Sequence, residues 1–467
     1  MKRFVRILAT IILVGFISSC TSDNPILETD TKTLTPTELA TIVKKRFFHD
    51  RTDVCLAVAV IEGVKTTPTF FCANPSHDRG YNKNTVFEIG SVTKTMQAAL
   101  LADFVLSKKV TLNDPVINHL PVGFSVPTFA GKAIQLIHLA THTSGLPSLP
   151  SDFLPTNPDD PYANFSEVIL RNSLRTITLN HEPGTAWNYS NLGAMLLSLS
   201  ITNIGGESLD TLLQKKLFTP LKMNNATLSI RRSRTEAKGH IPGGKIVPAW
   251  NFMTSLAGVG GVRASLQDMI QYAKGQLGQI ISPITPALEK TQILVSSAAE
   301  HGGPPDMGLG WIIMSLDGHS WIAHEGGTGG FSSFIAINRA DQRAVIILAD
   351  TTFGNFGGLG SLGLHLMDKN QPLETPRLVT TPKKKLLSAL QGSYVVDGVN
   401  VQLSYKNKQL YFQAAGESKI ALGYDSKGDF YPLNIDALLT PKITPKGYTF
   451  IWTQDGVAVE AVRITPP

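Results

Sequence analysis

The sequence predicts an α+β fold followed by a separate β-rich domain at the C-terminal end. β-Branched and aromatic runs stand at both ends of a long first region, at residues 54–73 and 310–350, and helical runs lie between them. Strands from both ends of a region that enclose a helical middle favour an antiparallel sheet flanked by helices. From Leu386 onward, short alternating stretches separated by Gly, Asn, Asp and Lys turns predict a small barrel-like or sandwich-like antiparallel β domain.

Length and composition exclude several protein classes. The chain has 467 residues, which suggests roughly two or three domains. Hydrophobic residues make up 42% and charged residues 17%, so the composition is neither that of a disordered chain nor that of a coiled coil. The net charge of +6 is spread over short basic runs. Such runs are usually solvated, and we therefore expect no nucleic-acid partner.

The N-terminus has the pattern of a secretory signal. A basic start precedes an apolar run at residues 7–17, which is too short to span ~30 Å of hydrocarbon as a helix. The segment Ile17-Ser18-Ser19-Cys20 resembles a bacterial lipobox, which implies lipidation of Cys20 and a membrane anchor; a chance cysteine at the cleavage point is the alternative. We expect a signal peptide at residues 1–19, a polar tether at 20–34 and an exported lipoprotein facing the periplasm or the cell exterior.

The remaining cysteines form an even pair in a predicted hairpin. Two strand-like runs, at residues 54–61 and 69–73, flank Glu62-Gly63-Val64-Lys65. A turn centred between Gly63 and Val64 places Cys55 opposite Cys72. A disulfide fits an exported protein, and two buried thiols are the alternative.

Local signals divide the chain further. Thr35-Pro36-Thr37-Glu38 combines an N-cap, a proline at the first helical position and a Glu at N3, which predicts a helix through Phe48. We expect a first domain at 35–367, a Pro-, Thr- and Lys-rich linker at 368–385 and a β domain at 386–467. The first domain is predicted to contain further helices at 93–106, 192–201 and 209–217 and strands at 310–315, 320–324, 331–338 and 344–350. In the β domain, the predicted strands are 392–396, 399–405, 409–414, 430–434, 447–453 and 457–464.

A serine and a lysine stand three residues apart at a predicted helix start. Gly90 ends an apolar run, and Ser91 opens the helix, where backbone N–H groups favour negative charge. Lys94 lies on the same helical face, with its Cβ atom ~5–6 Å from that of Ser91. An amine at this spacing could take the proton of a nucleophilic hydroxyl. Chance alone also produces this spacing, so its context must decide.

Two further segments supply that context. Residues 181–193, HEPGTAWNYSNLG, place Tyr189 and Asn191 on a turn before an apolar helix, and residues 321–331, WIAHEGGTGGF, end a strand in glycines. With Ser91-Val92-Thr93-Lys94, they resemble the three motifs of the serine β-lactamase and penicillin-binding superfamily, in its class C and esterase-like branch. The segments LATHTSGLP at 139–147 and SLQDM at 265–269 also resemble this family. The resemblance covers roughly residues 35–366 and implies a β-lactamase/transpeptidase-like fold.

The resemblance implies a role for each motif residue. Ser91 would attack a carbonyl and form an acyl-enzyme, and either the Lys94 amine or the Tyr189 phenolate would take its proton. Asn191 would orient Lys94 and the substrate amide. The backbone N–H groups of Ser91 and Gly327 would form the oxyanion hole. The remaining substrate-binding positions would be His324, Glu325 and Gly326. The implied partner is a small-molecule or peptide substrate, with no metal or other cofactor, and the sequence indicates no oligomeric state.

Each motif has a rival elsewhere in the chain. Tyr162-Ala163-Asn164 and Tyr405-Lys406-Asn407 match the tyrosine-x-asparagine spacing, but neither has the Pro-Gly-Thr lead-in or the apolar helix that flank Tyr189. His301-Gly302-Gly303 rivals His324-Glu325-Gly326, but only the latter lies between two predicted strands.

Two weaker signals are interpreted as structural. His138 and His142 stand four residues apart, as in zinc peptidases, but Leu139 occupies the position that would need a glutamate base. The glycines at 326–330 lack the Gly-Lys-Ser/Thr of a phosphate-binding loop and more simply let a substrate backbone approach the strand.

Two departures from class C β-lactamases bear on the substrate. Their third motif begins with Lys and Thr, whereas this chain has His324 and Glu325, and Leu149 occupies the place of a side-chain-binding Gln. A neutral histidine and a glutamate are poor partners for an anion, so we expect small esters or amides to be better substrates than anionic β-lactams. The candidate substrates as a whole are small esters or amides, D-amino-acid peptides and β-lactams. A catalytically weak penicillin-recognising or cell-wall-peptide-binding lipoprotein is the non-enzymatic alternative.

Overall fold

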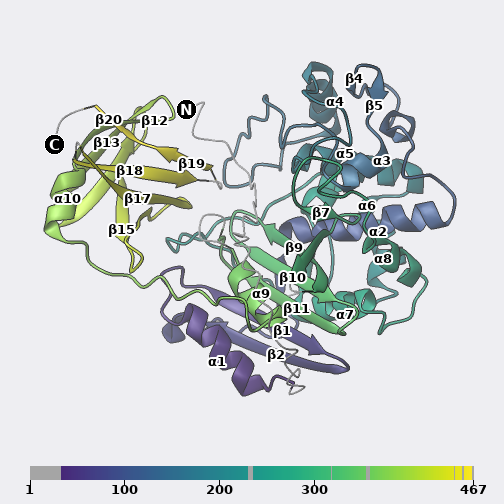
Figure 1. Cartoon of the computed structure of the whole chain (residues 1–467), viewed down its shortest axis with the longest axis horizontal. Helices are drawn as coiled ribbons and strands as arrows, with labels where there is room; N and C mark the ends of the chain where they lie inside the picture. The colour runs from purple at the N-terminus through teal and green to yellow at the C-terminus, as the bar shows by residue number, and fades with distance from the viewer. Residues whose placement is uncertain are drawn as a thin grey trace.

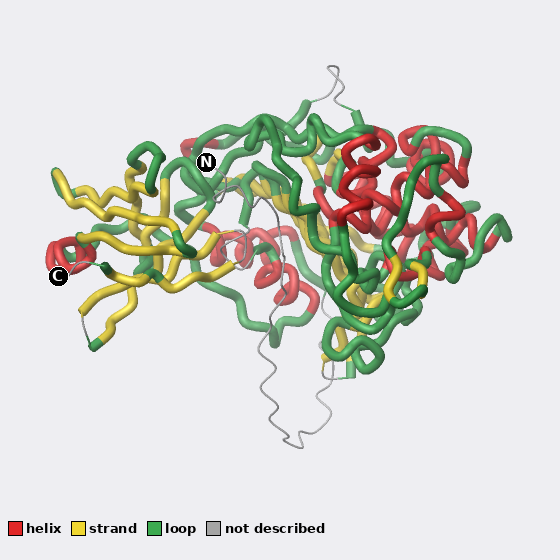
Figure 2. Tube along the Cα trace, turned by 90° about the horizontal axis from the view of Figure 1, so that it is seen from above, coloured by secondary structure: helices red, strands yellow, loops and turns green. Residues whose placement is uncertain are grey.

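The computed structural model describes residues 33–467 except 230–234, 317, 354–357, 446, 455–456 and 465–467. The predicted signal peptide and Cys20 therefore lie outside the described residues. Figure 1 shows a large α/β body and, at one end of the long axis, a smaller β domain. In Figure 2 most helices gather toward the end of the molecule opposite that domain.

A seven-stranded antiparallel sheet in the order β2-β1-β11-β10-β9-β8-β7 forms the centre of the large body. Its strands are β1 (Cys55–Glu62), β2 (Lys65–Cys72), β7 (Asp306–Met307), β8 (Ile312–Leu316), β9 (His319–Gly327), β10 (Ser332–Asn338) and β11 (Arg343–Ala349). Because β1 pairs with β11, the two ends of the domain close one sheet, as the sequence predicts. The α+β class is confirmed.

Helices cover both faces of this sheet, so alternate residues of each strand enter different cores. On one face lie α1 (Pro36–Phe47) and α9 (Gly360–Met367), which pack on Ala323, Phe334 and other apolar residues. On the other face lies a larger core that includes Ile322 and Ile335. That core is built from α2 (Thr93–Leu106), α3 (Leu136–Ala140), α4 (Glu167–Thr176), α5 (Asn191–Gly205), α6 (Leu209–Leu213), α7 (Leu266–Gln276) and α8 (Thr285–Thr291).

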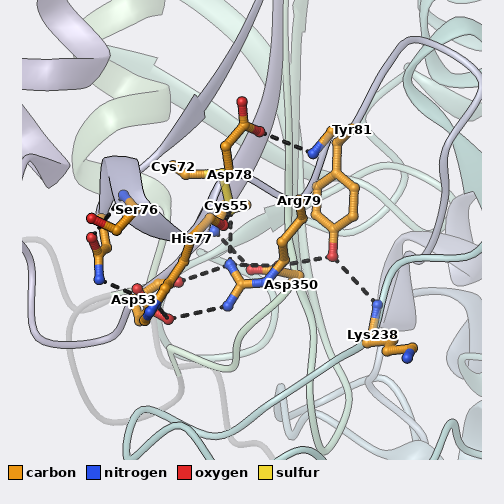
Figure 3. Close-up of a disulfide and its surroundings, with 12 residues drawn as sticks. Asp53, Cys55, Cys72, Ser76, His77, Asp78, Arg79, Tyr81, Lys238 and Asp350 are labelled. Atoms are coloured by element: carbon orange, nitrogen blue, oxygen red, sulfur yellow. Dashed lines mark hydrogen bonds and ion pairs between the residues drawn. A yellow bond between two sulfur atoms is a disulfide. The ribbon is translucent and has the colours of Figure 1, made fainter.

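Local sequence signals set α1 and the first hairpin. The Thr35 hydroxyl accepts the Glu38 backbone N–H, and the Glu38 carboxylate accepts that of Thr35, which is the predicted capping box. Cys55 stands opposite Cys72 in the β1–β2 register, and a disulfide joins them. Figure 3 shows Arg79 beside this bridge, with Nη1 2.8 Å from Cys55 Sγ and 3.3 Å from the Asp350 carboxylate.

The C-terminal β domain is a nine-stranded antiparallel sheet that nearly closes on itself. The strand order runs from β19 through β18 to β12 and ends at β20, and only Ala461 separates β19 from β20 along the chain. Its strands are β12 (Gly392–Val396), β13 (Val399–Lys406), β14 (Gln409–Ala414), β15 (Ile420–Tyr424), β16 (Phe430–Pro432), β17 (Ala437–Thr444), β18 (Gly447–Gln454), β19 (Val457–Glu460) and β20 (Val462–Arg463). The sequence interpretation missed β15 and β17, and α10 (Lys384–Leu390) begins within the last two residues of the predicted linker.

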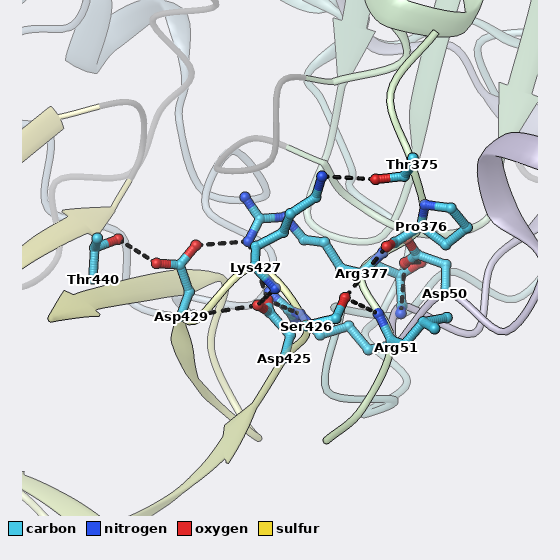
Figure 4. A network of polar contacts seen from close by, with 12 residues as sticks. Asp50, Arg51, Thr375, Pro376, Arg377, Asp425, Ser426, Lys427, Asp429 and Thr440 are labelled. Carbon is cyan, nitrogen blue, oxygen red and sulfur yellow. Dashed lines mark hydrogen bonds and ion pairs between the residues drawn. The ribbon is translucent and has the colours of Figure 1, made fainter. Parts of the chain in front are cut away.

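Buried ion pairs fix this domain to the large body. Arg51 donates from Nε to Asp425 at 2.9 Å with both side chains fully buried, and its guanidinium lies 3.7 Å from the centre of the Tyr431 ring. From the linker, Arg377 pairs with Asp425 at 3.1 Å and with Asp429 at 2.7 Å (Figure 4). Moving the β domain away from the large body would separate these buried partners and leave uncompensated charges, which is costly. The network therefore favours one relative position of the two units.

None of the helices in the described parts of the chain combines the length and the apolar character needed to cross a bilayer.

Candidate active site

Ser91 lies where the small strand β3 passes into helix α2. After β3 (Val86–Glu88), residues Gly90–Val92 form a 3₁₀ turn, and α2 begins at Thr93. The sequence suggested that Ser91 is the first residue of the α-helix. In the structure Ser91 lies two residues before α2, in the turn at the N-terminal end of that helix. The side chain of Ser91 is buried, with 7% of the residue exposed. Before this turn, β3 pairs with β6 (Arg263–Ser265), and a buried ion pair of 3.2 Å joins Glu88 of β3 to Arg263 of β6.

Lys94 reaches the Ser91 hydroxyl from the first turn of α2. Its Nζ lies 2.8 Å from Ser91 Oγ and donates to the Val259 carbonyl at 2.6 Å. Val259 belongs to the 3₁₀ helix η5 (Thr254–Val259). Burial alone lowers the pKa of Lys94 well below its ordinary value, since desolvation disfavours the ammonium form. A neutral amine beside a serine hydroxyl is able to accept its proton.

Tyr189 and Asn191 lie at the start of α5 (Asn191–Gly205), on either side of its N-cap Ser190. The Lys94 Nζ is 5.0 Å from the centre of the Tyr189 ring. Burial raises the pKa of Tyr189 despite the opposing effect of the Ser91 hydroxyl, so its phenol is protonated at neutral pH. Tyr189 Oη and both polar atoms of the Asn191 amide are buried and have no hydrogen-bond partner among the described residues. These groups are available to a ligand.

His142 is a functional candidate that the sequence interpretation treated as structural. Its ring lies 4.3 Å from the ring of Tyr189, centre to centre, and its Nδ1 accepts the Ser190 backbone N–H at 3.1 Å. Burial, with the nearby Lys94 and His324, lowers the pKa of His142, so the ring is neutral. His142 belongs to the segment LATHTSGLP, which resembles the family, but the sequence contains no pattern that places His142 beside Tyr189.

Strand β9 places His324 and Glu325 on opposite faces of the sheet. His324 faces the site: burial, and secondarily the charge of Lys94, lowers its pKa to about 3, so it is neutral. Its Nδ1–H donates to the Glu325 carbonyl at 2.6 Å, which leaves Nε2 as an acceptor. Glu325 instead points toward α9, where Gly360 donates a backbone N–H to it. Of the two positions expected to bind substrate, only His324 is therefore on the face of the sheet that carries the site.

Glycines let the nucleophile turn and the end of β9 approach each other closely. A Cβ atom on Gly90 would lie 2.5 Å from the Gly327 backbone nitrogen, and one on Gly326 would lie 2.0 Å from the Ile89 carbonyl oxygen. Gly90 also has a φ of +48°, which favours glycine. The backbone of Gly327 is therefore adjacent to the turn that carries Ser91, as the predicted oxyanion hole requires.

The structure also places the rival motifs. Tyr405 and Asn407 lie at the end of β13 in the β domain, away from the catalytic segments. Tyr162 is buried in the large body, 4.9 Å from Phe252 and 5.5 Å from Trp250 between ring centres. It is near enough to Tyr189 for ionisation of Tyr189 to raise the pKa of Tyr162. Tyr162 therefore borders the site. In the described part of the chain it makes no hydrogen bond with Ser91 or Lys94, whereas those two residues are hydrogen-bonded to each other.

Comparisons with known proteins agree with this geometry. The family model described as Beta-lactamase matches residues 45–360. The chain is 27% identical over 369 residues to the D-alanyl-D-alanine-carboxypeptidase/endopeptidase AmpH of Escherichia coli K12, covering 73% of this chain and 93% of that protein. It is 25% identical to penicillin-binding protein 4* of Bacillus subtilis 168, covering 85% and 91%.

Solved structures show the same fold. A β-lactamase/D-alanine carboxypeptidase from Pseudomonas syringae superposes with a TM-score of 0.60 at 20% identity, covering 72% of this chain and 98% of that one. The resemblance noted from the three motifs is confirmed. The chain belongs to the beta-lactamase family of serine hydrolases, which includes β-lactamases and D-alanyl-D-alanine peptidases.

Proposed function

We propose that the protein is a hydrolase that forms an acyl-enzyme on Ser91. The observation that carries this proposal is the 2.8 Å contact between Ser91 Oγ and the Nζ of a fully buried Lys94 whose pKa is lowered by burial. No charged partner contributes to that shift. A lysine whose ammonium form is disfavoured by burial, in contact with a serine hydroxyl, fits the activation of a nucleophile better than it fits a structural contact.

The proposed reaction has two stages. Lys94 takes the Ser91 proton as Oγ bonds to the substrate carbonyl carbon, and the N–H groups of Ser91 and Gly327 stabilise the resulting oxyanion. The carbon–leaving-group bond then breaks, and the proton on Lys94 passes to the leaving oxygen or nitrogen, directly or through the Tyr189 hydroxyl. Water attacks the acyl-enzyme in the second stage and loses its proton to the same base. The bond between the acyl carbon and Oγ then breaks, and the base returns the proton to Oγ. Asn191 would hold the substrate amide with its unfilled amide group.

The electrostatics of the site favour small esters or amides over anionic β-lactams. His324 replaces a cationic lysine and is neutral, and burial disfavours the charged form of Lys94, so the site has little fixed positive charge. The relative AmpH is named for action on D-alanyl-D-alanine, which makes peptide ends of this kind candidates, although their carboxylate would also lack a cationic partner here.

Covalent labelling tests the proposed function. We expect a fluorophosphonate probe to label the wild-type protein and not Ser91→Ala, because the serine oxygen is the phosphonylated atom. The wild type should also hydrolyse p-nitrophenyl acetate with a higher kcat/KM than nitrocefin. A folded wild-type protein that is neither labelled nor active on a panel of esters and D-alanyl peptides would instead be the binding lipoprotein. Faster turnover of nitrocefin than of the ester would contradict the substrate part of the proposal.

We also propose that the protein is exported and tethered to the membrane through Cys20. The basic and apolar start and the segment Ile17-Ser18-Ser19-Cys20 support this. The intact mass from the membrane fraction should correspond to a chain that begins at Cys20 and carries acyl groups, and Cys20→Ser should abolish the lipid modification. Cleavage at another residue, or a wild-type product without lipid, would contradict the tether.

A further inference from the structure

Glu325 lies beside the active site, on the opposite face of the strand that carries His324. A Cβ atom on Gly358 would be 3.2 Å from both carboxylate oxygens, and the Gly360 N–H at the start of α9 donates to the carboxylate. The second oxygen, Oε1, is buried and has no hydrogen-bond partner in the described part of the chain. The carboxylate is therefore only half satisfied.

Among the residues that the structure describes, no cation offsets the charge of this carboxylate. Its surroundings are Phe334 on β10, Ile312 and Met314 on β8 and the backbone of α9, none of which carries charge among the described residues. Burial raises the pKa of Glu325 to about 7, as expected for a carboxyl group in an apolar site without a counter-charge. Glu325 is partly exposed, but its Oε1 is buried and unpartnered, so a ligand that supplies a positive charge would gain a charge-assisted hydrogen bond here.

A narrow cavity of about 20 Å³, with room for little more than one group the size of a water molecule or an ammonium, lies between Glu325 and the catalytic groups. Its walls are the apolar side chains of Ile312, Met314, Ala323 and Phe334, and Tyr189 and His324 also line it. The cavity follows the edge of β9. The β8–β9 pairing ends at Ile312 and Ala323, so from His324 to Gly327 strand β9 pairs only with β10. A group attached to a substrate beside Tyr189 could therefore pass this unpaired edge and reach the carboxylate.

We propose that this cavity is a substrate subsite that binds a primary ammonium group carried on a short apolar stem, with Glu325 as its charge partner. The apolar walls match the stem, and the unpartnered Oε1 matches an N⁺–H donor. Because Tyr189 is the proposed route for the leaving-group proton, the ammonium belongs to the leaving side of the substrate. This subsite rests on the proposed hydrolase function and narrows its substrate class to esters or amides with a cationic leaving side.

Two rigid esters that differ mainly in charge test the subsite. We compare kcat/KM for 4-(aminomethyl)phenyl acetate and 4-ethylphenyl acetate in the wild type, in Glu325→Gln and in the control Glu460→Gln, which removes the same charge from an exposed pair with Lys442 in the β domain. For each protein we take the ratio of kcat/KM for the aminomethyl ester to kcat/KM for the ethyl ester. We then compare this ratio with the ratio in Glu325→Gln, so that the intrinsic reactivities of the two esters cancel. Glutamine keeps an oxygen that accepts the Gly360 N–H, so the anchoring of α9 is retained.

We expect the ratio to be about ten-fold higher in the wild type and in Glu460→Gln than in Glu325→Gln, the effect of one charge-assisted hydrogen bond. An unchanged ratio in Glu325→Gln, or an equal fall of both esters, would overturn the subsite and leave Glu325 as an anchor for α9. Parallel assays with p-nitrophenyl acetate separate this result from failure of the proposed function, in which the wild type would hydrolyse none of the three esters.

Discussion

Replacing Lys94 by methionine is expected to lower kcat/KM for p-nitrophenyl acetate by about 10²–10⁴-fold, the usual contribution of a general base. Lys94 is the group in contact with Ser91 Oγ, and burial lowers its pKa, whereas burial raises that of Tyr189. The neutral amine is the active form. Activity of the wild type should therefore rise with pH through the lowered pKa of Lys94 and then level off, and Lys94→Met should lose this rise.

Two further variants distinguish a base from a positive charge. Lys94→Arg retains a cation that does not deprotonate in proteins, so it should be as inactive as Lys94→Met if the lysine acts as a base. Tyr189→Phe should cost less than Lys94→Met, because the phenol is protonated and serves only the leaving-group side. A larger loss in Tyr189→Phe, with Lys94→Met within tenfold of the wild type, would assign the base to the tyrosine instead. Thermal unfolding of each variant checks that the fold is retained.

Gly90→Ala is expected to lower kcat for ester hydrolysis by about 10²–10³-fold, as for loss of an oxyanion-hole donor. The added methyl group would lie 2.5 Å from the Gly327 nitrogen and 2.7 Å from its carbonyl oxygen, so the end of β9 must move away from Ser91. Since the contact is with backbone, no side-chain rotation relieves it. Displacing Gly327 removes one of the two proposed oxyanion donors without changing Ser91, Lys94 or Tyr189.

Gly63→Ala is the matched control. Gly63 has a φ of +57°, close to the +48° of Gly90, but a Cβ atom there would have no atom within 4 Å. Both variants carry the backbone strain of alanine in the left-handed region, and only Gly90→Ala also displaces Gly327. Equal activity of the two variants would show that the position of Gly327 does not matter to the reaction, and the oxyanion hole would have to be sought elsewhere.

The sequence alone determined those features that depend on neighbours a few residues away. The capping box at Thr35 and Glu38, the placing of Lys94 one turn after Ser91 and the facing of Cys55 and Cys72 across a tight turn follow from helix and hairpin geometry. The alternation of side chains along a strand likewise places the neighbours His324 and Glu325 on opposite faces of β9. Strands with weaker alternation, such as β15 and β17, were missed because their pattern is interrupted by polar residues, proline or glycine.

Only the tertiary structure decided which distant groups meet at the site. The carbonyl of Val259 that binds Lys94 is backbone 165 residues further along the chain, and backbone carries no sequence signal. The packing of His142 on Tyr189 and the position of Tyr162 beside them depend on how loops cross over the helical core. The face and surroundings of Glu325 depend on where α9 packs against the sheet. Local periodicity reports only which residues share a face of one element, whereas pKa values and substrate contacts are set by which elements pack together.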